Sequence, residues 1–175
     1  MFAEILILLQ LWSVEKMNTE KINALKEMYK ERMRKDADEI RRHVEASIQR
    51  TTENGLHFFG NFIGLNFIGF EGDEFVTEVE SKPHIMNTAN VLQGGATATI
   101  ADLTMGFMLL ERYGHVVTLE MKTNYISPGV GKLFRTKARV VGKTGRHIIC
   151  ECRTMNEKGT VIAYSSGTFV QRKSE

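Results

Sequence analysis

Residues 87–112 read NTANVLQGGATATIADLTMGFMLLER, and this stretch decides how the rest of the chain can be arranged. It begins with polar, turn-forming residues, which are followed by the pair Gly94 and Gly95 and then by an apolar run. The run predicts a helix over 94–112. One carboxylate, Asp102, interrupts it, and burying an unpaired acid is costly. Asp102 must therefore reach solvent, be paired, or have a function.

The segments around this helix predict a sheet for it to cover. They are rich in strand-forming residues and are separated by Gly, Pro, Asn and Asp, as turns require. Strands are expected at 65–70, 74–80, 116–126, 132–141, 146–155 and 161–171. Apolar and charged residues alternate in 132–141, which gives one buried and one solvent-facing side. The predicted fold class is α+β, an antiparallel sheet with one long helix on its apolar face, over a domain at 56–175.

Residues 1–55 are predicted to form an N-terminal extension. Its first dozen residues are hydrophobic but lack a basic start and a cleavage site, and they are too few to span a bilayer. A translation start at Met17 is an open hypothesis. From 18 to 50 the chain is densely charged, and apolar residues recur every three or four positions, which predicts one or two amphipathic helices. They are expected to dock on the domain or on a partner subunit.

Composition excludes several function classes without naming one. The formal charge of +2 does not favour nucleic-acid binding, and the extension lacks the tight turn of a helix-turn-helix. The two cysteines, Cys150 and Cys152, point the same way on one strand and lack metal-ligand spacing. They are expected to be packing residues in a reducing cytoplasm.

The paired glycines allow two interpretations. Glycine weakens a helix start, so Gly94 and Gly95 indicate either an N-terminal turn with unusual dihedrals or a functional requirement. In the second case, their N–H groups are free at the positive end of the helix to bind an oxyanion. The residues alone leave both interpretations open.

A longer pattern then becomes visible across residues 60–171. It consists of Asn87, Gln93-Gly94-Gly95, Ala101-Asp102, Val117-Thr118-Leu119 and Tyr125-Ile126-Ser127-Pro128. This pattern resembles the PaaI-like hot-dog acyl-CoA thioesterases, which are related to 4-hydroxybenzoyl-CoA thioesterase. The resemblance implies a curved antiparallel sheet wrapped round one helix, and dimers or tetramers with active sites between protomers. It also implies hydrolysis of acyl-CoA to a free acid and CoA with no metal or redox cofactor.

The resemblance also assigns roles to individual residues. Asp102 takes the position of the catalytic acid, as nucleophile or as general base for water. Gly94 falls at the oxyanion-binding backbone position with Gly95 beside it. Asn87 matches the side chain that positions the thioester or the water, and Thr118 matches the hydroxyl that orients the acid or the water.

Other assigned residues concern the neighbourhood of the site. Gln93 stands where the family commonly has His, and Gln can form hydrogen bonds but cannot titrate. The resemblance makes Lys143 and Arg146, which flank a hairpin, candidates to bind a CoA phosphate, although basic hairpin tips are usually just solvated. His84 lies near the motif and is a candidate for the mouth of the site.

Two alternatives and one conflict remain. The chain could be a non-catalytic acyl-CoA-sensing domain with 18–50 as its effector helix, or a hot-dog dehydratase or hydratase. The latter uses a His and an acid at a spacing that this sequence does not show.

The conflict concerns Thr118, because simple alternation places it on the same face as Glu120 and Lys122. A β-bulge or a strong twist would have to separate them.

Overall fold

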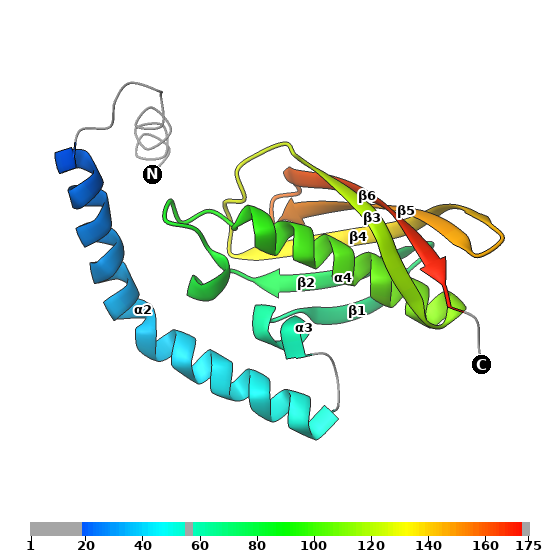
Figure 1. Ribbon diagram of the computed structural model, residues 1–175, viewed down its shortest axis with the longest axis horizontal. Coiled ribbons are helices and arrows are strands. Elements are labelled where there is room, and N and C mark those ends of the chain that lie inside the picture. Colours follow the sequence, from blue (N-terminus) through cyan, green and yellow to red (C-terminus); the bar gives the residue numbers. More distant parts are fainter. Residues whose placement is uncertain (1–18, 55–57, 173–175) are drawn as a thin grey trace.

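The computed structural model describes residues 19–54 and 58–172, and Figure 1 shows their arrangement. The expectations for residues 1–16 and for a start at Met17 lie outside the described residues. Helices are α2 (Thr19–Asn54), α3 (Phe58–Ile63) and α4 (Gly94–Tyr113), with a short 3-10 turn η1 (Pro83–Ile85). The strands are β1 (Asn66–Glu71), β2 (Glu74–Glu80), β3 (Val116–Tyr125), β4 (Leu133–Thr144), β5 (His147–Asn156) and β6 (Val161–Gln171). The central helix and six strands expected from the sequence are therefore present, with small shifts at their ends.

The strands form one antiparallel sheet in the order β1-β2-β4-β5-β6-β3. Helix α4 lies across one face of this sheet (Figure 1) and buries its apolar stripe there. The core on that face includes Ala101, Met105, Met108 and Leu109 from α4 and Phe169 from β6. Because the sheet is open, β1 and β3 form its two edges.

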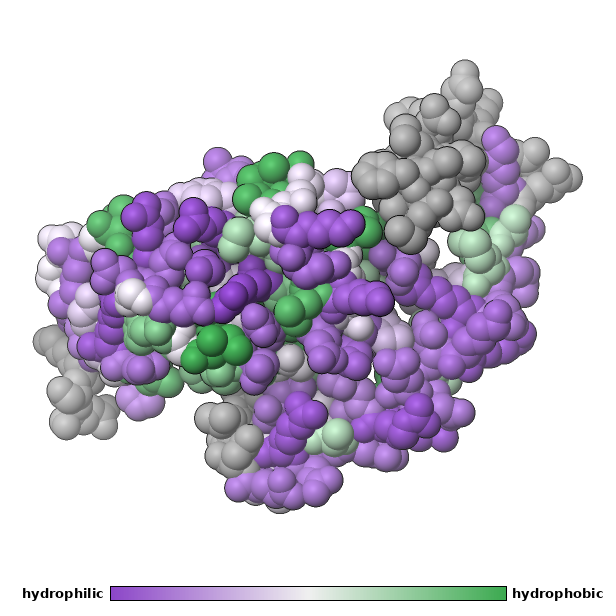
Figure 2. Space-filling view, turned by 180° about the vertical axis from the view of Figure 1, so that it is seen from behind, coloured by the Kyte–Doolittle hydropathy of each residue, from purple (hydrophilic) through white to green (hydrophobic). Residues whose placement is uncertain are grey.

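The opposite face of the sheet is charged, as the alternation predicts. Arg135 and Lys137 of β4 both contact Glu71 of β1, and Arg153 of β5 contacts Glu74 of β2 at 2.6 Å. The side of the molecule in Figure 2 is mainly hydrophilic with separate hydrophobic patches. Exposed ion pairs of this kind add little stability, so they mark a solvated face.

The two cysteines are packing residues, as expected. Both are free and buried, and burial raises the pKa of each thiol to about 12. They therefore stay protonated and contribute to the core under α4.

The N-terminal region differs in one respect from the expectation. Residues 18–50 were predicted as one or two helices, and their described part, from Thr19 on, lies in the single helix α2. Residues 58–63, which form α3, were expected to be connecting chain. The six residues of α3 are too few to show a helical period, and the helix is held by tertiary contacts with α2. Ser47 Oγ donates to the Asn61 carbonyl at 3.1 Å, and Asn61 Nδ2 donates to Thr51 Oγ1 at 2.9 Å. Among the described residues, no helix is long and apolar enough to cross a bilayer.

Candidate active site

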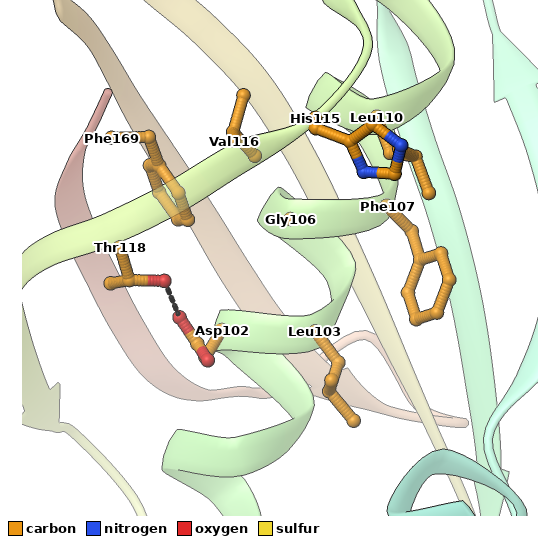
Figure 3. A pocket seen from close by; sticks show the side chains of 9 residues that line it. All are labelled: Asp102, Leu103, Gly106, Phe107, Leu110, His115, Val116, Thr118 and Phe169. Atoms are coloured by element: carbon orange, nitrogen blue, oxygen red, sulfur yellow. Dashed lines mark hydrogen bonds between the residues drawn. The ribbon is translucent and has the colours of Figure 1, made fainter. Parts of the chain in front are cut away.

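Asp102 is half-buried on α4, and its carboxylate is held by one side chain from the sheet. Thr118 of β3 donates its hydroxyl to Asp102 Oδ1 at 2.9 Å, the contact drawn in Figure 3. The acid therefore has a hydrogen-bond partner at Oδ1, and its Oδ2 atom is left to accept a proton or to contact a substrate. The resemblance implies that the Thr118 hydroxyl orients the acid or the water, and this contact allows the first of these roles, which stays a prediction.

A β-bulge resolves the conflict over the facing of Thr118. The pairing of β3 with β6 shifts register between Thr118, which faces Phe169, and Glu120, which faces Thr168. Glu120 accepts from the Thr168 hydroxyl at 2.7 Å, whereas Thr118 turns toward α4. The extra residue at the bulge, Leu119, separates the two facings.

Asp102 opens into a largely apolar hollow of about 200 Å³, called here the Asp102 hollow. Leu103, Phe107 and Leu110 line it from α4, with Gly106 between them (Figure 3). A methyl group at Gly106 would meet nothing within 4 Å, so the hollow has an open notch there. His115 also lines the hollow, although no pattern in the sequence singled it out. Its only signal was its place two residues after the end of α4.

The start of α4 carries the candidate oxyanion site. Gln93 is the N-cap residue, with φ −60° and ψ 135°, and its side-chain oxygen accepts from the Gly94 N–H at 3.1 Å. The Gln93 side chain therefore already accepts a hydrogen bond from the Gly94 N–H, which is the donor that the resemblance assigns to the oxyanion. Because Gln93 is neutral and exposed, an anionic oxygen could replace it at that donor.

Tyr125, at the end of β3, covers the same helix start. Its hydroxyl donates to the Gly94 carbonyl at 2.8 Å, and a Cβ at position 94 would lie 3.4 Å from the Tyr125 ring. A Cβ at position 94 would therefore be in ordinary van der Waals contact with the ring. Tyr125 was noticed in the sequence as part of a pattern but not as a site residue.

Asn87 organises the loop that leads into α4. Its Oδ1 accepts from the N–H groups of Ala89 at 2.9 Å and Val91 at 3.1 Å. The carboxamide oxygen is therefore committed to the loop, and only the Nδ2 group is left to donate to a thioester or a water. Val91 and Leu92 continue from this loop and, with Gly94 and Tyr125, line a second hollow of about 330 Å³, called here the Gly94 hollow.

The two hollows are separate within one chain. Positions 94 and 102 lie about 12 Å apart along α4, at about 1.5 Å per residue. Asp102 and Thr118 line the first hollow, and Gly94 and Tyr125 line the second. Thr118 and Tyr125 stand toward opposite ends of β3, which is an edge strand.

Three other predicted residues lie away from both hollows. Lys143 and Arg146 are exposed at the β4–β5 hairpin, where the Lys143 ammonium lies 5.5 Å from the Tyr113 ring centroid. His84 was a candidate for the mouth of the site, and this expectation is wrong. Its ring stacks on His43 of α2, with centroids 3.9 Å apart, because α2 covers that position. The described residues contain no group of three or more His, Cys, Asp or Glu side chains able to hold a metal ion.

Comparison with known protein families supports the resemblance for part of the chain. Residues 89–163 match the thioesterase superfamily. No curated protein matches the chain. Conserved protein PA5202 of Pseudomonas aeruginosa is similar in structure, at 27% identity and a TM-score of 0.63 over 69% of this chain and 98% of that one.

Two further structures show the same fold at lower identity. Protein BH2602 of Bacillus halodurans, crystallised with CoA, is 23% identical, with a TM-score of 0.69 over 76% of this chain and 88% of that one. The E. coli PaaI protein, from the phenylacetic acid degradation operon, is 13% identical, with a TM-score of 0.64 over 76% and 96%. The hot-dog fold is confirmed, and the match over residues 89–163 supports the resemblance to the thioesterase superfamily.

Proposed function

We propose that this protein hydrolyses acyl-CoA thioesters to a free acid and CoA, at a site completed by two protomers. The observation that carries the proposal is the Asp102 carboxylate, fixed by Thr118 in an apolar hollow beside the central helix. A thioester carbonyl needs an activated oxygen nucleophile and a stabilised oxyanion. Asp102 supplies the first, and the helix start at Gly94 supplies the second.

The chemical step follows from these two groups. As general base, Asp102 takes a proton from water, and the water oxygen adds to the carbonyl carbon. As nucleophile, its carboxylate adds directly, and water later hydrolyses the resulting anhydride. In both routes the carbonyl oxygen becomes negative, the C–S bond breaks, and the CoA thiolate leaves and is protonated. We propose that no metal or redox cofactor takes part, because neither route needs one.

Distance requires the second protomer. A single thioester carbonyl cannot contact both Gly94 and Asp102 of one helix, since they lie about 12 Å apart. Strand β3 offers a ten-residue free edge on which Val117 and Leu119 are 49% and 54% exposed. Antiparallel pairing of two β3 edges about a two-fold axis would bring the Thr118 end of one strand toward the Tyr125 end of its partner. The Asp102 hollow of one chain would then adjoin the Gly94 hollow of the other.

The hollow favours an apolar acyl group. Leu103, Phe107 and Leu110 would contact the acyl chain, whereas the polar CoA moiety would remain outside. CoA as the leaving group is supported by the similar protein crystallised with it. Lys143 and Arg146 remain candidate partners for its phosphates. The buried free thiols fit a cytoplasmic location.

The hydratase alternative has less support. His115 lines the same hollow as Asp102, but Figure 3 places its ring at the end opposite the Asp102–Thr118 pair. Within one chain, these two side chains therefore form no acid–histidine pair. The sensor alternative predicts binding without turnover, and the activity assay below decides it.

Asp102→Asn is the direct test. The substitution keeps the size of the side chain and its hydrogen bond to Thr118, but removes the base and nucleophile. Hydrolysis of a panel of short, long and aromatic acyl-CoAs should fall about 10²–10⁴-fold while acyl-CoA binding persists. Asp38→Asn, on the exposed side of α2, is the matched control and should retain activity. Turnover by Asp102→Asn at the wild-type rate would show that the assignment is wrong.

A further inference from the structure

Helix α2 contacts the loop before the candidate oxyanion site through one arginine. Arg32 Nη1 donates to the Asn87 carbonyl at 2.9 Å and lies 3.4 Å from the Thr88 carbonyl. Its Nη2 donates to Asn90 Oδ1 at 2.9 Å. The guanidinium thus contacts three oxygen atoms of one loop. The planar, forked guanidinium of arginine suits this geometry better than the single ammonium of lysine.

A second residue of α2 fixes the position of the Arg32 side chain. Its Nε lies 3.4 Å from the carboxylate of Asp36, one turn along the same helix. Two turns beyond Asp36, His43 stacks on His84 of η1, with ring centroids 3.9 Å apart, and His43 Nε2 lies 2.6 Å from the Phe62 carbonyl oxygen. Helix α2 therefore contacts both ends of the segment from His84 to Asn90, and presents Arg32 from a fixed element.

The loop that Arg32 contacts is continuous with the wall of the Gly94 hollow. Asn90 has a positive φ of 56°, so the loop holds a strained turn. Val91 and Leu92 follow immediately and line the hollow with Gly94. The Asn87 carbonyl that Arg32 binds also accepts from the Asn90 N–H at 3.0 Å. A shift at Asn87 would thus move the hollow wall and the first turn of α4.

We propose that Arg32 is a positioning residue of the thioesterase site, holding the 87–92 loop and through it the oxyanion donors at the start of α4. The inference rests on the proposed function. It gives the N-terminal helix, which lies outside residues 60–171 that carry the family pattern, a role in catalysis. Arg32 lines neither the Asp102 hollow nor the Gly94 hollow, so its proposed role is exerted through the loop.

The test compares Arg32→Met with Arg34→Met. Arg34 lies on the same helix, is exposed, and only faces Glu31 at 3.6 Å, so it is a matched control. Arg32→Met should lower kcat about 10- to 100-fold, because small misplacement of catalytic groups is costly, while KM changes little. Amide hydrogen exchange should accelerate in peptides covering 87–95 and not elsewhere. Arg34→Met should match wild type in both measurements.

Two further variants separate positioning from general stability. Arg32→Lys keeps the charge without the fork and should recover only part of kcat. Asn90→Gly keeps the positive φ, removes one acceptor, and should give a smaller change in the same direction. All assays are made well below the Tm of each variant. Unchanged kcat and unchanged exchange at 87–95 in Arg32→Met would overturn the proposal, as would equal losses in Arg34→Met.

The two proposals fail in different ways. If the wild-type protein hydrolyses no acyl-CoA, the proposed function is wrong, and exchange at 87–95 alone decides whether Arg32 holds the loop. If the wild type is active and Asp102→Asn is not, the function stands whatever Arg32→Met shows.

Discussion

At the scale of single residues, Asp102 shows how a costly group is retained in an apolar helix. Burial of a carboxylate without a partner is unfavourable, and the Thr118 hydroxyl compensates at 2.9 Å. Only the bulge at Leu119 lets that hydroxyl reach the helix. Asp102 could be singled out because it is an acid in an apolar run, but its catalytic role was implied only by the resemblance and stays a prediction. The bulge could not be predicted, because nothing in Val117-Thr118-Leu119-Glu120 specifies an extra residue.

Thr118→Val should therefore weaken catalysis more than folding. Valine has a similar shape but cannot donate to Asp102, and a hydrogen bond to a charged group contributes about 1.5–3 kcal/mol. We expect kcat for acyl-CoA hydrolysis to fall about 10- to 100-fold if most of that energy orients the acid. Thr118→Ser retains the hydroxyl and is the control. Equal rates for the valine and serine variants would contradict an orienting role.

Gly94 and Gln93 show a different limit of prediction. The glycine pair indicated a special helix start, and the structure adds that Tyr125 packs on Gly94. The Gln93 side chain occupies the Gly94 N–H, a contact that the sequence did not reveal. Local side-chain capping depends on the N-cap dihedrals, which single-residue patterns do not determine.

At the scale of elements, long periodic segments were predictable and short packed ones were not. The six strands and α4 follow from alternation and apolar runs that extend over many residues. Helix α3 escaped prediction because it is six residues long and depends on Ser47 and Thr51 of α2. His84 was misplaced for the same reason, since the contact with α2 is a tertiary one.

The contact of α2 with η1 should make stability depend on pH. Burial, with a contribution from His43, lowers the pKa of His84 from 6.5 to about 4. Among residues 19–54 and 58–172, no group forms a hydrogen bond with its ring nitrogens. Between these values the unfolded chain binds a proton at His84 that the folded chain does not. Stability should thus fall as the pH decreases from 6.5 toward 4, and no contribution remains above 6.5.

Urea unfolding at pH 7 and pH 5 measures this effect. The midpoint should be lower at pH 5 for the wild type, and His84→Phe, which cannot titrate, should reduce the difference. If His84→Phe shows the same difference between the two pH values as the wild type, His84 is not responsible.

At the scale of the whole molecule, the two groups of the proposed site, Asp102 and the Gly94 N–H, lie apart within one chain. The Asp102 and Gly94 hollows lie at separate positions along α4, and the β3 edge between them is free and apolar in part. The sequence pattern supplied the expectation of a shared site through its resemblance. The geometry supplies the physical reason, which is the distance of about 12 Å between positions 94 and 102.

Mixed dimers test this shared site most directly. Asp102→Asn removes the acid, and Gly94→Pro removes the oxyanion donor. Proline is tolerated at the first helical position, and the extended ψ of 135° at Gln93 suits a following proline. Each variant alone should be nearly inactive toward acyl-CoA. A dimer with one chain of each kind, isolated through two affinity tags, contains one intact site and one site lacking both groups.

We predict that the isolated mixed dimer recovers about half of the wild-type kcat, because one of its two symmetry-related sites is restored. Each parent homodimer, purified in the same way, should remain near the background rate. A mixed dimer that is as inactive as its parents, while both variants are folded and paired, would show that Asp102 and Gly94 do not act on one thioester from opposite chains.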